Sequence, residues 1–272
     1  MENVKYSVLM SVYYKENPVF LRESVQSILN QTIKPFEIII VKDGELTKEL
    51  DNVILEFEEN SLIKIISLKE NKGLGEALNV GLNYCSSELV ARMDTDDISM
   101  KDRCEKQLRL FDQNKSLSII SSAVAEFEED VNSIHSIKKI PITHEEIIRF
   151  SKKRNPFNHP AVMYKKSAVL RAGGYKHFSL YEDYYLWVRM IMDGAVCANI
   201  DEPLVYMRAN ENMYKRRGGF NYFKNTLNFK WHLVKLGFYT KFDFVMSALP
   251  HAIVSLLPNK ARIIVYNKFL RS

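Results

Sequence analysis

Cysteine, glycine and proline are scarce in this chain of 272 residues, which contains 3, 10 and 8 of them. The cysteines, Cys85, Cys104 and Cys197, show no paired metal-binding spacing, and their odd number argues against a disulfide framework. Such cysteine usage is typical of reduced thiols in the cytosol. The sequence also shows no internal repeat and no low-complexity linker. These absences favour one globular domain with an appendage, in a reducing compartment.

Signals for export and for membrane insertion are absent too. The amino terminus, Met1–Lys5, lacks the charged-then-apolar pattern of a signal peptide, so we expect a cytoplasmic protein. The apolar segment 242–257 is too short for a confident transmembrane helix, and Asp243, Pro250 and His251 interrupt it.

Acidic residues almost disappear from the end of the chain. Residues 214–272 contain 11 Lys and Arg against one acid, Asp243, whereas residues 1–213 have a net charge of −5. Basic residues alternate there with apolar and aromatic ones, which indicates amphipathic helices lying on an anionic membrane surface. The alternatives are a helical cap on the preceding domain and a homodimer interface. Nucleic acid is disfavoured, because the charges are interleaved with long apolar faces. The one candidate boundary is the stretch 208–219.

Strands and helices alternate through the first hundred residues. The pattern predicts buried strands at 6–12, 36–41, 63–68 and 88–92, with helices between them. Pro18 is suited to open the first helix. This alternation predicts an α/β fold with a mostly parallel sheet flanked by helices. Polar residues follow each strand and should meet at one edge of the sheet: Tyr13, Asp43, Asn71 and Asp94.

The most informative segment is Arg92–Asp97, with the sequence Arg-Met-Asp-Thr-Asp-Asp. Asp94 and Asp96 follow a buried strand one residue apart, so both should point to the same spot. Crowded carboxylates repel one another unless a cation lies among them, and oxygen ligands suit Mg²⁺ or Mn²⁺. The alternative is an acidic loop in which an aspartate caps the helix expected near Met100. These residues alone leave both interpretations open.

Seven segments in order resemble family 2 glycosyltransferases of the GT-A fold. They lie at 7–13, 27–32, 37–44, 71–79, 92–98, 158–163 and 181–189. The stretch 213–219 further resembles the subset that builds capsular and exopolysaccharide repeat units in bacteria. The resemblance covers about residues 5–210. It implies a GT-A catalytic domain over 1–213, with a nucleotide-binding half (1–100) and an acceptor half (101–213), followed by a basic helical region over 214–272.

The resemblance implies an inverting transfer of a sugar from a nucleotide diphosphate, with UDP-sugar as the expected donor. The expected acceptor is a saccharide linked by diphosphate to a polyprenyl lipid, at the inner face of the plasma membrane. A divalent metal would neutralise charge on the leaving diphosphate. Asp96 is then the expected direct ligand, with Asp94 on the ribose or bridged to the metal. Asp97 would cap the next helix or support the site.

The same resemblance assigns the nucleotide pocket. Asp43 would accept a hydrogen bond from the uracil N3–H, a contact that suits a carboxylate. The remaining pocket residues are Ser11, Tyr13 and Glu16 around the base and ribose, and Lys72 facing the nucleotide. For each of them the alternative is ordinary loop polarity.

Asp183 matches the position of the family's catalytic base. The adjacent Glu182 would raise the cost of ionising both carboxylates and so raise one pKa. The alternative is that both acids complement a positive helix N-terminus. Trp187 lies on the same helical face and is either a floor for the acceptor sugar or a core aromatic. His159 is expected near the acceptor cleft, or bonded to backbone in a loop.

One family feature is missing. Many relatives carry a histidine shortly after the last strand, where it can join the metal site, but segment 205–213 has none. Asn210 or water could substitute, or Asp96 and the donor diphosphate could hold the metal alone. Arg216 and Arg217 are expected to grip a diphosphate or to face lipid phosphates.

Two other functions share some of these features. A sugar-phosphate nucleotidylyltransferase would have the same sheet and acidic site, but it normally opens with a glycine-rich loop, and Ser11–Glu16 has no glycine. The second is a non-catalytic relative that binds lipid or nucleic acid through its basic end.

Overall fold

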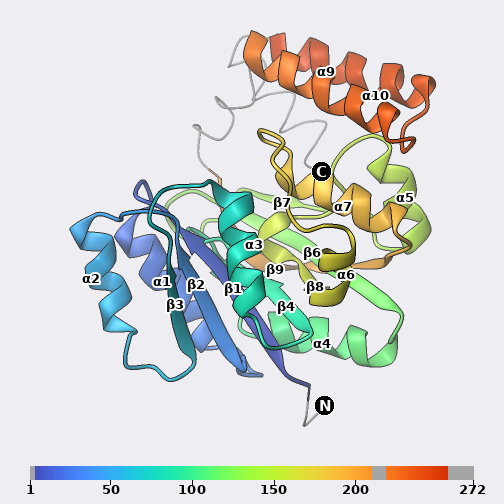
Figure 1. Ribbon diagram of the computed structural model, residues 1–272. Coiled ribbons are helices and arrows are strands. Elements are labelled where there is room, and N and C mark those ends of the chain that lie inside the picture. Colours follow the sequence, from blue (N-terminus) through green and yellow to red (C-terminus); the bar gives the residue numbers. More distant parts are fainter. Residues whose placement is uncertain (1–3, 210–218, 257–272) are drawn as a thin grey trace.

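The computed structural model describes residues 4–209 and 219–256, which fold around one nine-stranded sheet (Figure 1). The strand order is β3-β2-β1-β4-β8-β6-β9-β5, and β7 pairs with β6. The strands are β1 (Tyr6–Val12), β2 (Glu37–Lys42), β3 (Ile63–Ser67), β4 (Leu89–Arg92), β5 (Ile98–Ser99), β6 (Leu117–Phe127), β7 (Ser136–Lys138), β8 (Met163–Lys165) and β9 (Val196–Arg208).

The first half of the chain forms the parallel part of the sheet. Strands β3, β2, β1 and β4 pair in parallel, and helices connect them: α1 (Pro18–Leu29), α2 (Lys48–Glu56) and α3 (Leu74–Tyr84). Helix α1 begins as predicted at Pro18, and the Asn17 side chain caps it by accepting from the Val19 N–H. The predicted fold class, a largely parallel α/β sheet flanked by helices, is confirmed.

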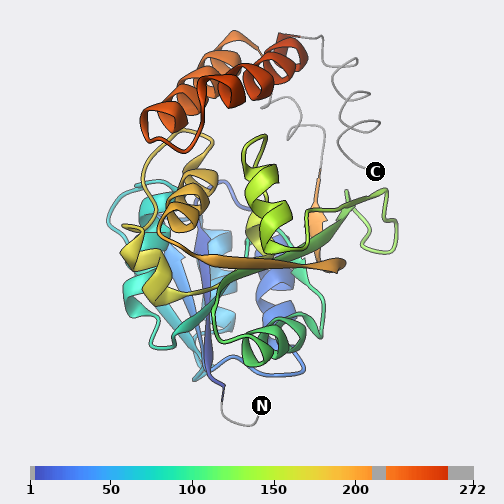
Figure 2. The same cartoon turned by 90° about the vertical axis from the view of Figure 1, so that its right-hand side faces the viewer.

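Helices cover both faces of this sheet (Figure 2), and an apolar cluster lies on each face. Alternate β1 residues Tyr6, Val8 and Met10 pack with α1, α2 and α4 (Arg103–Gln113), whereas Leu9 packs on the other face. That other face carries α3, α6 (Lys166–Arg171) and α7 (Glu182–Met192). Gly81 lets α3 approach closely, because a Cβ there would meet the Leu9 side chain at 2.4 Å. The α/β core is therefore a three-layer sandwich.

The second half of the sheet is mixed. β8 runs antiparallel to β4 and β6, while the long strands β6 and β9 pair in parallel with register shifts near Ser122. The helix expected near Met100 begins at Arg103, because residues Ile98–Ser99 first pair with β9 as β5. Two short helices complete this half, α5 (His144–Ser151) and the 3-10 turn η1 (His159–Ala161).

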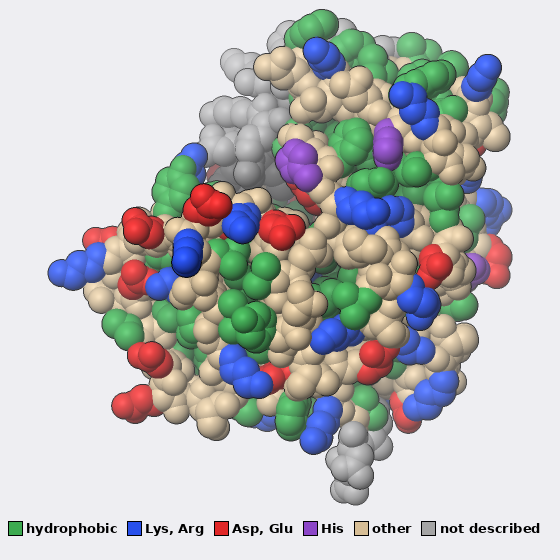
Figure 3. Space-filling model, in the orientation of Figure 1, with side chains coloured by type: hydrophobic (Ala, Val, Ile, Leu, Met, Phe, Trp, Pro, Cys, Tyr) green, Lys and Arg blue, Asp and Glu red, His purple; other side chains and the backbone are tan. Residues whose placement is uncertain are grey.

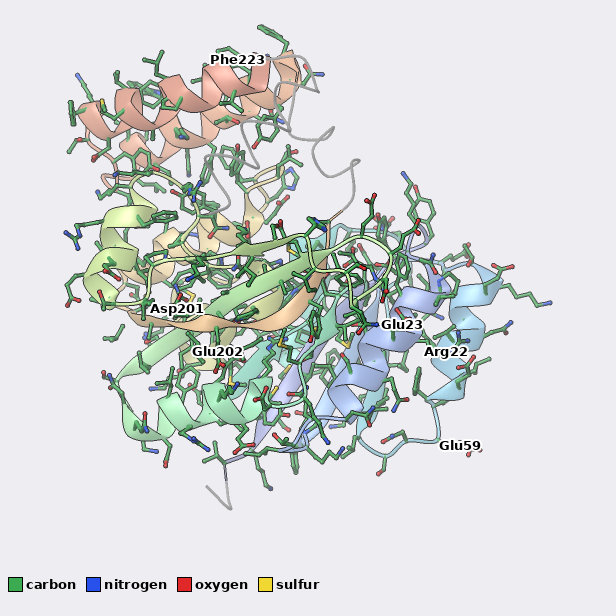
Figure 4. The ribbon with its side chains drawn as sticks, turned by 180° about the vertical axis from the view of Figure 1, so that it is seen from behind. Arg22, Glu23, Glu59, Asp201, Glu202 and Phe223 are labelled. Carbon is green, nitrogen blue, oxygen red and sulfur yellow. The ribbon has the colours of Figure 1, made fainter. Side chains whose placement is uncertain are left out.

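A helical pair, α9 (Phe220–Lys235) and α10 (Lys241–Leu256), lies beside α7 (Figure 1). Its inner side shares a buried cluster with α7, formed by Tyr184, Tyr185, Val188, Phe229, Leu233, Phe238 and Tyr239. Large apolar side chains on α9 and α10 stay exposed, among them Phe220, Trp231, Phe242, Val245, Met246 and Leu249. Figure 4 shows this pair, with Phe223, above the sheet. Among the described residues no helix is long and apolar enough to cross a membrane.

Candidate active site

The acidic segment after β4 lies at the carboxyl edge of the parallel strands, as the sequence predicted. Asp94 forms an ion pair with the buried Arg92, and its backbone carbonyl accepts a hydrogen bond of 2.7 Å from the Ser24 hydroxyl. The Asp94 side chain remains 27% exposed, so it can still contact a ligand. One long-range hydrogen bond thus fixes the backbone of this segment, and a local ion pair orients a carboxylate that stays partly exposed.

Asp96 lies where negative charge is crowded. Burial, together with the nearby carboxylates of Asp94 and Glu16, raises the pKa of Asp96 to about 7. Glu16 is held nearby by the Thr95 hydroxyl, which donates to it at 2.7 Å. A hard divalent cation fits this all-oxygen set, since it would relieve the repulsion that now disfavours ionisation.

The protein alone offers few ligands for such a cation. Within residues 4–209 and 219–256, no group of three or more His, Cys, Asp or Glu side chains is placed to hold a metal. Asp94 and Asp96 would therefore need oxygen ligands from a bound diphosphate or from water. Asn210, the candidate substitute for the missing histidine, lies outside the described residues, as do Arg216 and Arg217.

Asp97 supports the site and does not cap a helix. It is 2% exposed, and its Oδ1 accepts a 2.8 Å hydrogen bond from the backbone N–H of Arg208 at the end of β9. Burial raises the pKa of Asp97 well above its ordinary value. The residue that precedes α4 is Asp102, and its side chain makes no cap hydrogen bond.

Arg208 is a supporting residue that the sequence analysis missed. Its guanidinium lies 3.8 Å from the centre of the Phe20 ring and pairs with Glu23 on α1, which Figure 4 labels. Since its backbone also holds Asp97, Arg208 ties the last strand to the acidic segment. The contacts span more than a hundred residues of sequence, so no local pattern signals them.

Asp43 ties together the loops that follow β2 and β3. Its two carboxylate oxygens accept hydrogen bonds from the backbone N–H groups of Lys72 (2.7 Å) and Gly73 (3.0 Å). Gly44 follows with φ +85°, and a Cβ there would meet the Asn71 nitrogen at 2.6 Å. Asp43 is 2% exposed, so its visible role is to organise this loop.

The other predicted nucleotide residues surround the same edge. Ser11 is the half-buried penultimate residue of β1, and its carbonyl accepts from the Thr95 hydroxyl at 3.4 Å. Tyr13 is 39% exposed, with its ring edge-on to Tyr14, and the Lys72 side chain is exposed. The structure thus brings Ser11, Tyr13 and Glu16 beside the acidic segment, and places Lys72 beside Asp43.

A cavity of about 360 Å³ joins the acidic edge to the acceptor half. Asp94, His159 and Asp183, which lie far apart in the sequence, all line it. The rest of the lining comprises Glu126, Lys138, Lys139, Ile140, Phe150, Lys153, Arg154, Asn155, Phe157, Asn158, Pro160, Leu180, Tyr181, Tyr184, Met207, Tyr222 and Lys230. One space therefore reaches both the predicted metal segment and the predicted base.

Asp183 is held in this cavity by two hydrogen bonds. Its Oδ2 accepts from the Asn155 side chain at 2.8 Å, and its Oδ1 accepts from the Tyr184 N–H at 2.6 Å. Burial raises the pKa of Asp183 above its ordinary value, although these bonds and Lys138 oppose the rise. Asn155 is a further residue that sequence reasoning missed, since it lies 28 positions away.

Glu182 does not share the environment of Asp183. It is absent from the cavity lining and faces His177, with 3.8 Å between Oε1 and Nδ1. Burial is the main cause that raises the pKa of Glu182, and Asp183 adds to it. The predicted mutual effect is thus present at Glu182, while Asp183 is shifted mainly by its own burial.

Trp187 belongs to the core, so its interpretation as a floor for the acceptor sugar is wrong. The indole is 0% exposed, does not line the cavity, and packs among the rings of Phe157, Tyr164 and Tyr175. The apolar face of α7 turns it toward the sheet. His159 lies between Trp187 and the cavity, and its ring centroid is 6.3 Å from that of Trp187. Burial, together with Arg92, lowers the pKa of His159 well below its ordinary value, so the ring is neutral.

Comparison with known proteins identifies the family. Residues 7–177 match glycosyl transferase family 2. The chain is 41% identical over 267 residues to the UDP-Gal:alpha-D-GlcNAc-diphosphoundecaprenol beta-1,3-galactosyltransferase of Escherichia coli, covering 98% of this chain and 97% of that one. It is 38% identical over 220 residues to the amylovoran biosynthesis glycosyltransferase AmsE of Erwinia amylovora, covering 81% and 82%.

Solved structures agree on the fold. TarS 1–349 of S. aureus, in complex with UDP-GlcNAc, superposes with a TM-score of 0.66 at 16% identity, covering 85% of this chain and 67% of that one. The mannosyltransferase PcManGT of Pyrobaculum calidifontis, in complex with GDP-Man and Mn²⁺, gives 0.66 at 15% identity, covering 97% and 79%. The predicted relationship is confirmed: the chain belongs to glycosyltransferase family 2 and is an enzyme whose relatives include glycosyltransferases of bacterial polysaccharide biosynthesis.

Proposed function

We propose that this enzyme transfers a sugar from a UDP-sugar to a hydroxyl of a diphosphate-linked lipid saccharide in surface polysaccharide biosynthesis, with inversion at the anomeric carbon. The observation that carries the proposal is the single cavity lined by both Asp94 and Asp183. The near full-length similarity to a galactosyltransferase named for UDP-Gal and a diphosphoundecaprenol acceptor supports it.

Asp183 acts as the general base in this proposal. Its carboxylate takes the proton from the acceptor hydroxyl while that oxygen attacks the anomeric carbon, and the bond from that carbon to the diphosphate breaks. UDP leaves with the electron pair. Asn155 holds the carboxylate in place, and the raised pKa of Asp183 makes it a stronger base than an exposed aspartate.

Asp94 and Asp96 would hold a divalent cation, Mn²⁺ or Mg²⁺, together with the donor diphosphate. When bound, that ion supplies neutralisation of the negative charge on the leaving group. Asp97 and Arg208 keep the segment in position from behind. The Mn²⁺ in the PcManGT complex supports a metal of this kind.

The nucleotide would lie over the loops that follow β1, β2 and β3. We assign Ser11, Tyr13 and Glu16 to the base and ribose, and Lys72 to the nucleotide. Asp43 already accepts two backbone hydrogen bonds, but a carboxylate has about four acceptor positions. One of the others would accept from the uracil N3–H.

Membrane contact is the second part of the proposal. α9 and α10 present exposed Phe242, Met246 and Leu249 beside basic residues, and Figure 3 shows hydrophobic and basic side chains together over this pair. Such a surface suits the anionic inner face of the plasma membrane. We therefore divide the chain into a catalytic region, 1–213, and a membrane-binding region, 214–272.

Calorimetric titration with UDP, GDP, CDP and dTDP, with Mn²⁺ and then with EDTA, tests the donor site. We expect UDP to bind most tightly and only with metal. Transfer from UDP-galactose to GlcNAc-diphospho-undecyl lipid then tests the reaction, with Asp96→Ala as the inactive variant and Asp102→Ala as an acidic control outside the site.

Other outcomes separate the alternatives. Preference for another nucleotide would keep the family but overturn the role of Asp43. Release of UDP-sugar from a sugar phosphate and UTP, with inorganic pyrophosphate as product, would identify a nucleotidylyltransferase. Absence of metal-linked nucleotide binding would make this chain a non-catalytic relative.

A further inference from the structure

One side of the cavity is basic, and the mechanism described above does not use it. Lys138 ends β7, and Lys153 and Arg154 follow α5; all three line the cavity. Lys139 lines it as well and lies 3.8 Å from Asp201. The acidic residues in the lining are Asp94, Glu126 and Asp183.

Lys230 differs from these cations. It lines the cavity from α9, but it is 2% exposed and its ammonium donates to the Ser247 carbonyl. Burial lowers the pKa of Lys230 to about 7, so much of it is uncharged near neutral pH. The positive side of the cavity is therefore formed by β7 and the segment after α5.

This basic side is adjacent to the base. Arg154 directly precedes Asn155, which holds the Asp183 carboxylate at 2.8 Å. The positive charge of Lys138 is near enough to favour ionised Asp183. The guanidinium of Arg154 lies 4.8 Å from the centre of the Phe150 ring, which also lines the cavity.

A buried hydrogen-bond acceptor also lies in the wall. Asn158 is 1% exposed, and its amide nitrogen donates to the Ser122 carbonyl at 2.9 Å. Its Oδ1 has no hydrogen-bond partner among the described residues. A buried polar atom without a partner is costly, but this oxygen has almost no exposed surface, so it makes the wall polar without offering a ligand contact.

We propose that Lys138, Lys153 and Arg154 bind the diphosphate of the acceptor lipid, and that the acceptor carries one sugar between this diphosphate and Asp183. The inference rests on the function proposed above and deepens it. Arginine and lysine recognise phosphate through charge-assisted hydrogen bonds.

The position of the three cations and the lining residues Leu180 and Tyr222 favour the acceptor's diphosphate over the donor's, and the cavity volume bears on the size of the acceptor. The three cations come from β7 and the segment after α5, whereas the donor edge is formed by the loops after β1, β2 and β4. The cavity, at about 360 Å³, lies near the small end of ligand pockets, roughly 300–1,000 Å³. It therefore suits one sugar with its diphosphate better than an oligosaccharide. The exposed Leu180 and the aromatic Tyr222 also line it and offer a path for the lipid toward the helical pair.

A comparison of two acceptors tests this site. GlcNAc-diphospho-undecyl and undecyl α-GlcNAc carry the same sugar and alkyl chain, but only the first has a diphosphate. For Lys153→Ala/Arg154→Ala we expect the ratio of kcat/KM for these two acceptors to fall by about 100-fold, the size expected for two lost charge-assisted hydrogen bonds. With lysine in place of alanine at position 154 (Arg154→Lys), part of the lost ratio should be recovered, because lysine keeps the positive charge. Lys48→Ala/Arg109→Ala removes two cations outside the cavity and should leave the ratio unchanged.

The outcomes are separable. An unchanged ratio with equal loss on both acceptors means that the segment only positions Asn155, and it overturns the proposal. A raised KM for the UDP-sugar, or weaker UDP binding, assigns the cations to the donor and also overturns it. If the wild type transfers to neither acceptor, the proposed function fails, but calorimetry with undecyl diphosphate still decides the diphosphate site. Tight binding by the wild type and loss in the double variant would then support it, and equal binding would refute it.

Discussion

The proposed donor half, residues 1–100, and the proposed acceptor half, residues 101–213, place their carboxylates in different ways. On the donor side, Asp94, Asp96 and Asp97 come from one short segment after one strand, and they crowd together. On the acceptor side, Asp183 shares its cavity with separate segments and is held by Asn155. In the proposed function, the crowded group would hold a cation and the Asp183 carboxylate would accept a proton. One cavity is thus lined by two carboxylates that are held in different ways, Asp94 and Asp183.

Removing the isolated carboxylate should have the largest effect on this comparison. We expect Asp183→Asn to lower kcat for transfer by roughly 10²–10⁴-fold, the range of general-base contributions, with UDP affinity unchanged. Steady-state kinetics measure kcat for transfer, and calorimetry measures UDP affinity, so the two effects are determined separately. Glu182→Gln is the matched control, because Glu182 is adjacent but lies outside the cavity lining. Equal loss of UDP binding and transfer in Asp183→Asn would refute the role of base.

Substitutions of Trp187 test whether this side chain packs in the core or contacts the substrate. Truncating a fully buried tryptophan costs about 3–5 kcal/mol, so Trp187→Ala should strongly lower the free energy of unfolding, measured in urea. Trp187→Phe should lose much less and should keep the acceptor KM in the folded enzyme. A large rise in acceptor KM for Trp187→Phe at unchanged stability would restore the sugar-platform interpretation.

The donor half can be tested through Asp43. Asp43→Asn weakens the bonds from the Lys72 and Gly73 N–H groups, so we expect a loss of about 1–3 kcal/mol of stability and weaker UDP binding. Acceptor KM should not change, because Asp43 does not line the cavity. Lost stability with unchanged UDP affinity would reduce Asp43 to a loop-organising residue.

The pH dependence should report the isolated carboxylate. Because burial raises the pKa of Asp183, the protonated, inactive form persists above the ordinary range of aspartate. Transfer should therefore fall about tenfold per pH unit below the raised pKa and reach a plateau above it. A kcat profile on saturating acceptor measures this limb. An acid limb at the ordinary aspartate pKa, or one retained unchanged in Asp183→Asn, would contradict the assignment.

The smallest effect is expected outside both halves. Replacing exposed Phe242, Met246 and Leu249 by serine should release the enzyme from anionic vesicles, while solution activity on a short-chain acceptor stays within a factor of about two. Leu55→Ser is the control, because Leu55 is an exposed apolar residue on α2, outside the helical pair. Unchanged sedimentation with vesicles would contradict membrane binding through this face. Deletion from Gly219 is a poorer test, because it also uncovers the cluster on α7.

The sequence predicts the donor half better than the acceptor half, for a physical reason. Apolar runs such as Val8–Val12 and the closely spaced acids Asp94 and Asp96 are local signals, and the parallel strand order follows from the alternation of strands and helices. The contacts Arg208–Asp97 and Asn155–Asp183 join distant segments, and no local period marks them. The direction of the Trp187 side chain depends on which face of α7 meets the sheet. That orientation is set by the packing of α7 into two clusters, one on the sheet and one on the helical pair.

Helix α7 belongs to two bodies at once. Its Leu186, Trp187 and Met190 are packed into the sheet, its Tyr184, Tyr185 and Val188 into the helical pair, and Asp183 lies in its first turn. The helix therefore connects the catalytic core to the surface proposed to rest on lipid. If that surface rests on a bilayer as proposed, the tilt of α7 would set the angle at which a lipid-borne hydroxyl meets the Asp183 carboxylate. Orientation on a membrane would then govern regiochemistry as well as local concentration.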